Sequence, residues 1–259
     1  MAGKVVTRFE SVFPALTRVA FDTPVVGRTL DAVRARGKHL LMEFSGDLVL
    51  RTHMRMNGSW HIYPIGARWK RPTRDMRIIV GTRDAVAVGF NIPVAEFLAG
   101  RDVARNELLR TLGPDLLDPA FDRYEALRRM RGRTREPIAD VLLDQRVVAG
   151  IGNVFKSEIL YEACVNPFTP TAAIDDAGLD RVVDTAVRLM RANVLDAAQT
   201  LSPAVGRRTT KRLDPNEKLW VYGRAGKPCR QCGTPISSRS TGLDARLTFW
   251  CPVCQPGPS

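Results

Sequence analysis

The chain has 259 residues, 44% of them hydrophobic, which is enough to bury a core and excludes a wholly disordered protein. Its 39 Lys and Arg outnumber 27 Asp and Glu, and the net charge of +12 favours a polyanionic partner, because each neutralised phosphate releases condensed counterions. There is no apolar run of about 18 residues and no signal-peptide pattern, so we expect a cytoplasmic protein without a membrane partner.

The first part of the chain carries the pattern of β structure. Short runs rich in Val, Ile and Leu are separated by turn residues, and Ser45-Gly46-Asp47 joins two of them as a tight hairpin turn would. We expect a β-sandwich, with a barrel as the alternative, over residues 1-100. The predicted strands are Thr29 to Val33, His39 to Phe44, Leu48 to Thr52, Arg77 to Val80 and Val86 to Phe90.

From Val103 onward, apolar residues recur at helical spacing, which predicts a helical domain over residues 103-200. A polar, basic linker follows from Pro203 to Asp214, and a cysteine-bearing domain occupies residues 219-255. The fold class is therefore α+β. The predicted helices are Glu107 to Thr111, Arg123 to Met130, Ile138 to Leu143, Val154 to Ala163 and Leu179 to Ala198.

Four cysteines near the C-terminus form two Cys-x2-Cys pairs, Cys229 with Cys232 and Cys251 with Cys254, and eighteen residues separate the pairs. This spacing predicts a zinc site, and two disulfides or a redox pair are the alternatives. Four thiolates complete a tetrahedron and leave no position for water, so we expect one structural Zn2+. We expect the fifth cysteine, Cys164, to be a buried small hydrophobe.

The segment around these cysteines is strongly basic. Ten basic residues stand against three acidic ones between Arg207 and Arg246, which favours a clamp on a nucleic-acid backbone. We expect Thr234 to Ser237 to pair with Leu247 to Trp250 as a hairpin, with Ser238 to Arg246 as its exposed turn.

A turn containing two glycines, Gly150-Ile151-Gly152, and Asn153 joins two predicted helices. We expect Asn153 to cap the second helix. Glycine lets the backbone approach a phosphate closely, and free amides at a helix start attract an anion, so this turn can hold a DNA backbone. An ordinary helix-helix turn is an equally good interpretation of the local chemistry.

Several ordered motifs together resemble the bacterial formamidopyrimidine-DNA glycosylase and endonuclease VIII family. The run from Val148 to Leu160 resembles its helix-two-turn-helix signature, and the two cysteine pairs with Arg246-Leu247-Thr248-Phe249-Trp250 resemble its zinc finger. Arg36-Gly37-Lys38-His39-Leu40-Leu41 is similar to its catalytic-lysine hairpin, and His53 to Trp60 to its wedge loop. The resemblance extends from about residue 27 to residue 255.

The resemblance implies excision of oxidised bases from duplex DNA, followed by β- or β,δ-elimination at the abasic site. Such an enzyme turns the lesion out of the helix, and an apolar side chain fills the vacated stack. Met56 matches this wedge, with Arg55 and Asn57 beside it, and a core methionine is the alternative. We expect a monomer in the bacterial cytoplasm, associated with the nucleoid.

Three more residues acquire a role through the resemblance. Lys38 matches the catalytic-site lysine that contacts phosphate near the reacting sugar, although by local pattern it is simply a solvated lysine. Asn153 and Arg246 match the groups that grip the phosphates around the flipped nucleotide, and a guanidinium can hold two phosphate oxygens at once.

The start of the chain departs from the family pattern. The family's nucleophile is an N-terminal proline followed by glutamate and an amphipathic helix, whereas this sequence begins Met1-Ala2-Gly3-Lys4. An α-amine titrates near 7.7–8.0 and lysine near 10.4, so the terminus supplies far more free base at neutral pH. A late start codon, a truncated chain, or a weak amine from Ala2 or Lys38 would each account for the departure. We expect this chain as printed to excise bases poorly.

Three functions remain as hypotheses. The first is a DNA glycosylase with AP lyase activity, and the second is a catalytically silent, zinc-dependent binder of damaged or abasic DNA. The third is a zinc-ribbon protein that binds RNA or the ribosome, against which the Lys38 hairpin and the wedge loop argue.

Overall fold

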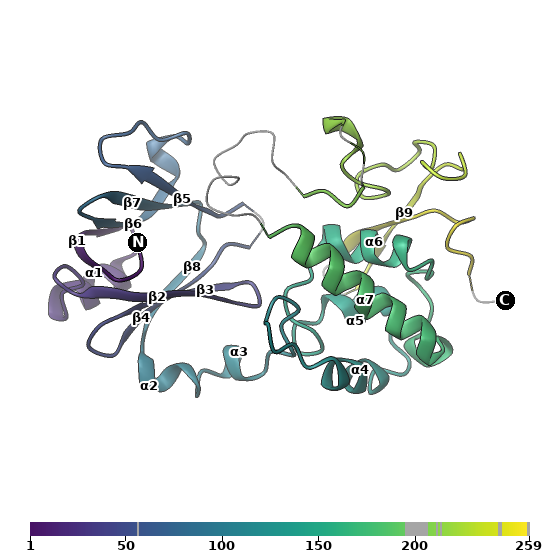
Figure 1. Ribbon diagram of the computed structural model, residues 1–259, viewed down its shortest axis with the longest axis horizontal. Helices are drawn as coiled ribbons and strands as arrows, with labels where there is room; N and C mark the ends of the chain where they lie inside the picture. Colours follow the sequence, from purple (N-terminus) through teal and green to yellow (C-terminus); the bar gives the residue numbers. More distant parts are fainter. Residues whose placement is uncertain (56, 195–206, 211, 213, 243–244, 258–259) are drawn as a thin grey trace. The chain divides into compact units, whose positions relative to one another are not determined.

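The computed structural model describes residues 1–55, 57–194, 207–210, 212, 214–242 and 245–257. The chain divides into two compact units, Met1–Thr111 and Leu112–Ser259. The first unit consists mainly of strands and the second mainly of helices, which confirms the α+β prediction (Figure 1). Within the described ranges, no helix has both the length and the apolar composition needed to cross a bilayer.

The first unit is an antiparallel β structure whose described strands follow the order β5-β7-β6-β1-β2-β3-β4-β8. β1 joins its two halves, because Lys4 and Val5 pair with β2 while Val6 to Ser11 pair with β6. The strands are β1 (Lys4–Ser11), β2 (Thr29–Arg36), β3 (His39–Phe44), β4 (Leu48–His53), β5 (Ser59–Pro64), β6 (Met76–Thr82), β7 (Ala85–Phe90) and β8 (Val94–Ala99).

The two halves face each other across one apolar core. Leu30 and Leu50 from one half lie in the same buried cluster as Ile78 and Val80 from the other, as expected for a sandwich. Leu16 of helix α1 (Pro14–Asp22) closes the cluster and is 1% exposed. Burying these side chains removes apolar surface from water, which is the main force that holds the halves together.

All five predicted strands are present, and Ser45 to Asp47 forms the predicted turn between β3 and β4. Sequence reasoning missed β1, β5, β8, α1 and the short helix α2 (Gly100–Val103), whereas the helix predicted at Glu107 to Thr111 is present as α3 (Glu107–Arg110). The missed strands carry exposed or half-buried side chains on most of their length, so their apolar pattern is weak.

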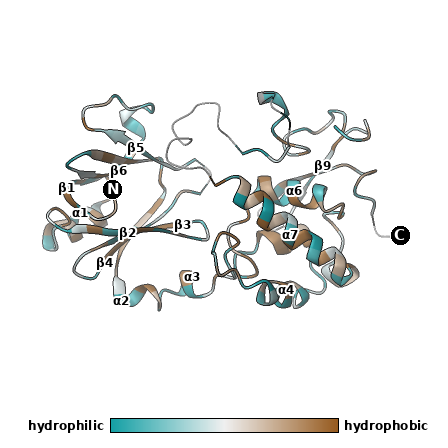
Figure 2. Ribbon diagram, in the orientation of Figure 1, coloured by the Kyte–Doolittle hydropathy of each residue, from teal (hydrophilic) through white to brown (hydrophobic). Residues whose placement is uncertain are grey.

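The second unit has a helical core that matches the predicted helices. Its helices are α4 (Arg123–Arg131), α5 (Ile138–Leu143), α6 (Asn153–Glu162) and α7 (Asp176–Ala192), while residues 195–198 of the predicted last helix lie outside the described residues. α7 presents hydrophobic and hydrophilic faces (Figure 2). Its Val182 and Val183 lie in one buried cluster with Ile159 and Leu160 of α6. Asp175 caps α7 by accepting a hydrogen bond from Gly178 N at 2.7 Å.

The C-terminal hairpin differs from its prediction. β9 (Ser237–Thr241) pairs with β10 (Arg246–Trp250), so most of the expected turn from Ser238 to Arg246 is strand and Thr234 to Ile236 is not. Thr241 and Thr248 explain the longer pairing, because their hydroxyls hydrogen-bond across the strands at 2.7 Å and Thr248 is fully buried. Tertiary contacts therefore override the weak strand propensity of Ser and Arg here.

Candidate metal centre and nucleic-acid interface

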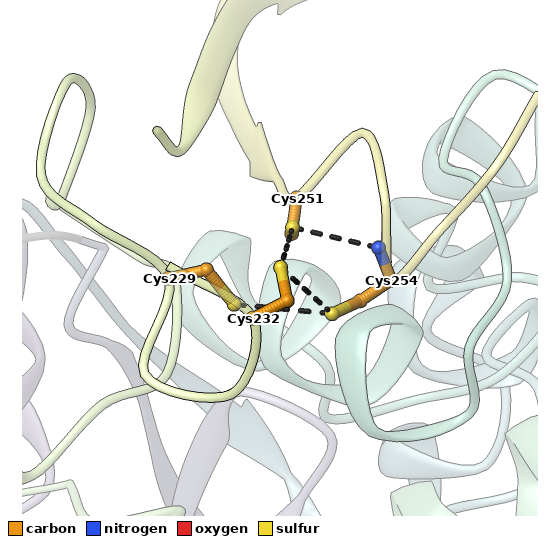
Figure 3. A group of neighbouring side chains, drawn as sticks. All are labelled: Cys229, Cys232, Cys251 and Cys254. Atoms are coloured by element: carbon orange, nitrogen blue, oxygen red, sulfur yellow. Dashed lines mark hydrogen bonds between the residues drawn. The ribbon is translucent and has the colours of Figure 1, made fainter. Parts of the chain in front are cut away.

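The four cysteines of the two pairs converge on one point (Figure 3). Their sulfur atoms all lie within 4.8 Å of one another. The Cys229–Cys254, Cys232–Cys251 and Cys232–Cys254 Sγ distances are 3.9, 3.5 and 3.6 Å. Tetrahedral Zn–S bonds of about 2.3 Å place sulfurs about 3.8 Å apart, whereas a disulfide needs about 2.05 Å. The cysteines thus fit one structural zinc, as predicted, and do not form disulfides.

The thiolates have their own supporting contacts. Tyr161 of α6 lies with its hydroxyl 3.3 Å from Cys229 Sγ and packs in an apolar cluster with Val221, Ile236 and Phe249. Such contacts orient the side chains of metal ligands and restrict their rotation. The fifth cysteine contradicts its prediction, because Cys164 is exposed. It follows the end of α6 in a left-handed conformation, with φ 56°, which turns it away from the core.

Glu158 of α6 anchors the chain that leads into the finger. Its carboxylate is fully buried and accepts hydrogen bonds from the backbone N–H groups of Trp220, Val221 and Tyr222 at 2.8, 2.9 and 2.8 Å. Thr209 Oγ1 donates a fourth hydrogen bond. Several donors around one carboxylate offset the cost of burying its charge.

The glycine-bearing turn is held by a side chain to which sequence reasoning gave no role. Gln145 Oε1 accepts from Gly150 N at 3.0 Å, and its Nε2 donates to the carbonyl oxygens of Leu143 and Ile151 at 2.9 and 3.1 Å. Gly150 has φ 106°, a conformation that L side chains rarely adopt. The turn is therefore fixed by local hydrogen bonds and by a glycine that its backbone requires.

Asn153 does not cap the second helix, contrary to the prediction. Gly152 is the N-cap of α6 and makes no side-chain cap, so Asn153 is the first helical residue. Its Nδ2 instead donates to the carbonyl oxygen of Leu247 on β10 at 3.0 Å. This bond places the turn beside Arg246, the neighbour of Leu247 in the finger, so two predicted phosphate contacts come together although 94 positions separate the bonded residues.

An amide nitrogen carries two N–H groups, and Leu247 uses one of those on Asn153. Arg246 is exposed. The pair can therefore present a neutral donor and a cation at one place, which suits a phosphodiester group.

In the first unit, Lys38 lies in the two-residue turn between β2 and β3, where Arg36 pairs with His39. Burial, and after it the charge of Lys38, lowers the pKa of His53, so this imidazole lies near the turn. The ring of His39 is 4.7 Å from that of His53. The charge of Lys38 thus favours the neutral form of His53.

Buried Arg51 organises this group. Its guanidinium is 2.6 Å from Glu96 Oε1 and 2.9 Å from His39 Nδ1. Because Arg donates only, His39 Nδ1 is the acceptor and the ring proton lies on Nε2. Burial first, then His53 and Arg51, lower the pKa of His39 to about 4.

Substitution of Arg51 by Met is expected to raise the pKa of His39 from about 4 towards its ordinary value of 6.5. In the wild type, the pKa of His39 is lower in the folded protein than in the unfolded chain. Between pH 6.5 and about 4 the unfolded chain therefore binds more protons, and the free energy of unfolding falls as the pH drops through this range. NMR titration of the imidazole protons measures the shift. Arg34→Met, at an exposed position on β2, is the control, and an equal pKa of His39 in both variants would contradict the assignment.

The predicted wedge loop connects β4 to β5. Arg55 and Asn57 are exposed at its tip, and Met56 lies outside the described residues. Gly58 N bonds to Met54 O at 2.9 Å, and Arg55 has φ 46°, a left-handed conformation that costs a non-glycine residue about 1–2 kcal/mol. An open cavity of about 830 Å³ adjoins the loop, and no acidic residue is among its described lining, which is Met54, Arg55, Asn57, Gly58, Arg71, Arg77, Asn91, Ile92 and Pro93.

Much of the remaining basic charge is used inside the second unit. Arg123 pairs with Asp180 and Asp184, and Glu125 receives both Arg128 and Arg129. Arg212, in the linker, and Arg230, in the finger, share Glu217, while Arg239 stacks over the ring of Phe168 at 3.7 Å. These arginines are paired inside the protein, so the count of basic residues overstates the charge available to a ligand.

Family models match the chain in three segments. The formamidopyrimidine-DNA glycosylase N-terminal domain matches residues 1–93, its H2TH domain matches residues 112–203, and the zinc finger found in FPG and IleRS matches residues 226–257. The chain is 38% identical over 262 residues to the probable endonuclease 8 2 of Streptomyces coelicolor, covering all of this chain and 89% of that protein. The chain belongs to the formamidopyrimidine-DNA glycosylase and endonuclease 8 family.

Other relatives agree with this membership. The DNA-(apurinic or apyrimidinic site) lyase Nei2 of Mycolicibacterium smegmatis is 35% identical over 98% of this chain and 92% of its own length. The fold of the Lactococcus lactis Fpg, solved in complex with abasic-site DNA, superposes with a TM-score of 0.79 over 99% of this chain and 94% of that one, at 24% identity. Glu158 and Gln145 are two residues that sequence reasoning left without a role, and their signal was their place in or next to the helix-two-turn-helix motif.

Proposed function

We propose that this protein is a base-excision DNA glycosylase with AP lyase activity, which binds duplex DNA that contains oxidised bases or abasic sites. The observation that carries the proposal is the bond between Asn153 and Leu247, because it joins the helix-two-turn-helix turn to the zinc finger beside Arg246. A neutral amide and a guanidinium at one place suit the backbone of a kinked strand. Family membership and the printed activities of its relatives support the same reaction class.

The first unit offers a second set of DNA contacts under this proposal. Lys38 contacts a phosphate near the reacting sugar, and the exposed Arg55 and Asn57 flank Met56 as it fills the stack that the flipped nucleotide leaves. The cavity beside the wedge loop, whose described lining holds three arginines and no carboxylate, adds positive potential without reading sequence. We propose that the protein acts as a monomer and is recovered with the nucleoid.

DNA binding is tested by fluorescence anisotropy with an abasic-site duplex over a range of salt concentrations. We expect tighter binding to this duplex than to undamaged duplex, and a slope of log K against log salt that becomes shallower by about 1 in Arg246→Gln, because one phosphate contact is lost. Arg239→Gln is the matched control on the same hairpin, since its guanidinium stacks on Phe168. If the slope of log K against log salt were the same in the two variants, Arg246 would not be a phosphate contact.

A catalytically silent binder of abasic DNA is the second candidate function, and borohydride trapping separates it from the enzyme. An amine that attacks the abasic sugar forms a Schiff base, which borohydride reduces to a covalent adduct that mass spectrometry can map. An adduct supports the glycosylase and lyase. Tight binding without an adduct supports the silent binder, and absence of binding overturns both.

A further inference from the structure

Lys156 of α6 is a lysine with no exposed surface. Its Nζ donates to Thr248 Oγ1 on β10 at 2.6 Å. An ammonium group loses its hydration when it is buried, which is costly unless polar or charged partners replace the water. The buried Lys156 ammonium, at the contact between α6 and the finger, must therefore be compensated by the groups around it.

Polar and charged groups of α5 and the hairpin act on the ammonium of Lys156. Thr248 also bonds to Thr241 across the hairpin at 2.7 Å. Asp140 of α5 faces the ammonium and stabilises its charged form, while Asp140 Oδ1 is a buried oxygen without a hydrogen-bond partner among the described residues. A Cβ atom at Gly242 would meet the same oxygen at 3.1 Å, so the hairpin closes over it.

This joint is one of three successive links between α6 and β10. Asn153 bonds to Leu247, Lys156 to Thr248, and Phe249 N to Ser157 Oγ at 3.3 Å. Along α6 the three bonded residues come in the same order as their partners along β10. The links therefore set the position of β10 along α6. Lys156 makes the middle one and is the cation among them.

We propose that Lys156 is a positioning residue, which as a buried ammonium seats β10 on α6 and so holds Arg246 beside Asn153 for a shared phosphate. The inference rests on the proposed DNA-binding role of those two residues. Lys156 itself need not touch DNA, since it acts through Thr248 and through its charge beneath the bound phosphate.

The charges around Lys156 give the proposal a pH signature. Burial, opposed by Asp140 and aided by Arg246, lowers the pKa of Lys156 to about 8. A phosphate held nearby favours the protonated form, so DNA binding takes up a proton and weakens as the pH rises through this value. Asp140 on α5, whose own pKa is raised by burial, and Arg246 on β10 are the charged groups that act on Lys156.

Lys156→Met in the zinc-loaded full chain tests this. We expect the Kd for an abasic-site duplex to rise about tenfold at pH 7, as loss of a charged hydrogen bond would produce. The ratio of variant to wild-type Kd should then fall towards one by pH 9.5, because the wild type loses its ammonium. Val183→Ala, in the core of the same unit, controls for lost stability and should leave both Kd and its pH dependence unchanged.

Thr248→Val serves as a second variant, since it removes the hydroxyl acceptor and keeps the size of the side chain. We expect a smaller rise in Kd, of about threefold. Wild-type affinity in Lys156→Met at pH 7, or parallel pH profiles for it and the wild type, would overturn the inference alone. Failure of the wild type to bind abasic DNA would overturn the proposed function and this inference with it.

Discussion

Removal of the zinc is expected to unfold the finger and to abolish binding to abasic-site DNA. Without the cation the four sulfurs lose the bonds that hold the two cysteine pairs together, and the apolar cluster around Cys229, Cys251 and Phe249 is too small to hold the hairpin unaided. Structural zinc contributes about 10–16 kcal/mol in isolated fingers at neutral pH, far more than any single side chain here. The helical core, which is a separate cluster, should remain folded.

Metal analysis of the purified chain is expected to give one zinc per molecule, and chelation should release it together with the DNA. Cys251→Ala removes a ligand and should reproduce the chelated state. Cys164→Ala is the matched control, because this cysteine is exposed and lies outside the four-cysteine group. Full DNA affinity in the chelated protein would contradict the structural role of the metal.

Glu158→Gln is expected to be the most destabilising single substitution among the polar residues of the second unit. Glutamine keeps the shape but replaces one carboxylate oxygen by a donor, which then faces backbone N–H groups of Trp220, Val221 or Tyr222. Each buried group left without a partner costs about 1–3 kcal/mol, so we expect a loss of about 3 kcal/mol or more. The segment that leads into the finger should detach from α6, and DNA affinity should fall with it.

Urea denaturation of the zinc-loaded chain measures this loss. Glu162→Gln is the matched control one helical turn further on, where the carboxylate is partly exposed and bonds to the side chains of Trp220 and Arg188. We expect that control to cost less than about 1 kcal/mol, as partly exposed pairs do. Similar losses in the two variants would show that the backbone bonds to Glu158 do not anchor the finger.

Glycine turns, strand patterns and cysteine spacing could be predicted because each depends on residues close in sequence. The turn from Ser45 to Asp47 follows this rule, as do the five predicted strands. Asn153 shows where local reasoning fails, because its residue type favours a helix cap and yet its amide bonds to a strand far along the chain. Cys164 fails similarly, since an apolar neighbourhood in sequence does not say which way a residue after a helix end will face.

The sequence by itself determined the α+β class and the four zinc ligands, because periodicity and cysteine spacing depend on residues close together in the chain. Its ordered motifs also carried the resemblance to the family. The tertiary structure alone decided that Asn153 bonds beside Arg246, that Glu158 anchors the finger, and that Lys156 is buried beneath it. Those contacts join residues more than 60 positions apart, and Lys156 and Thr248 are 92 apart. No local propensity encodes such pairs, since burial and packing of the whole unit select them.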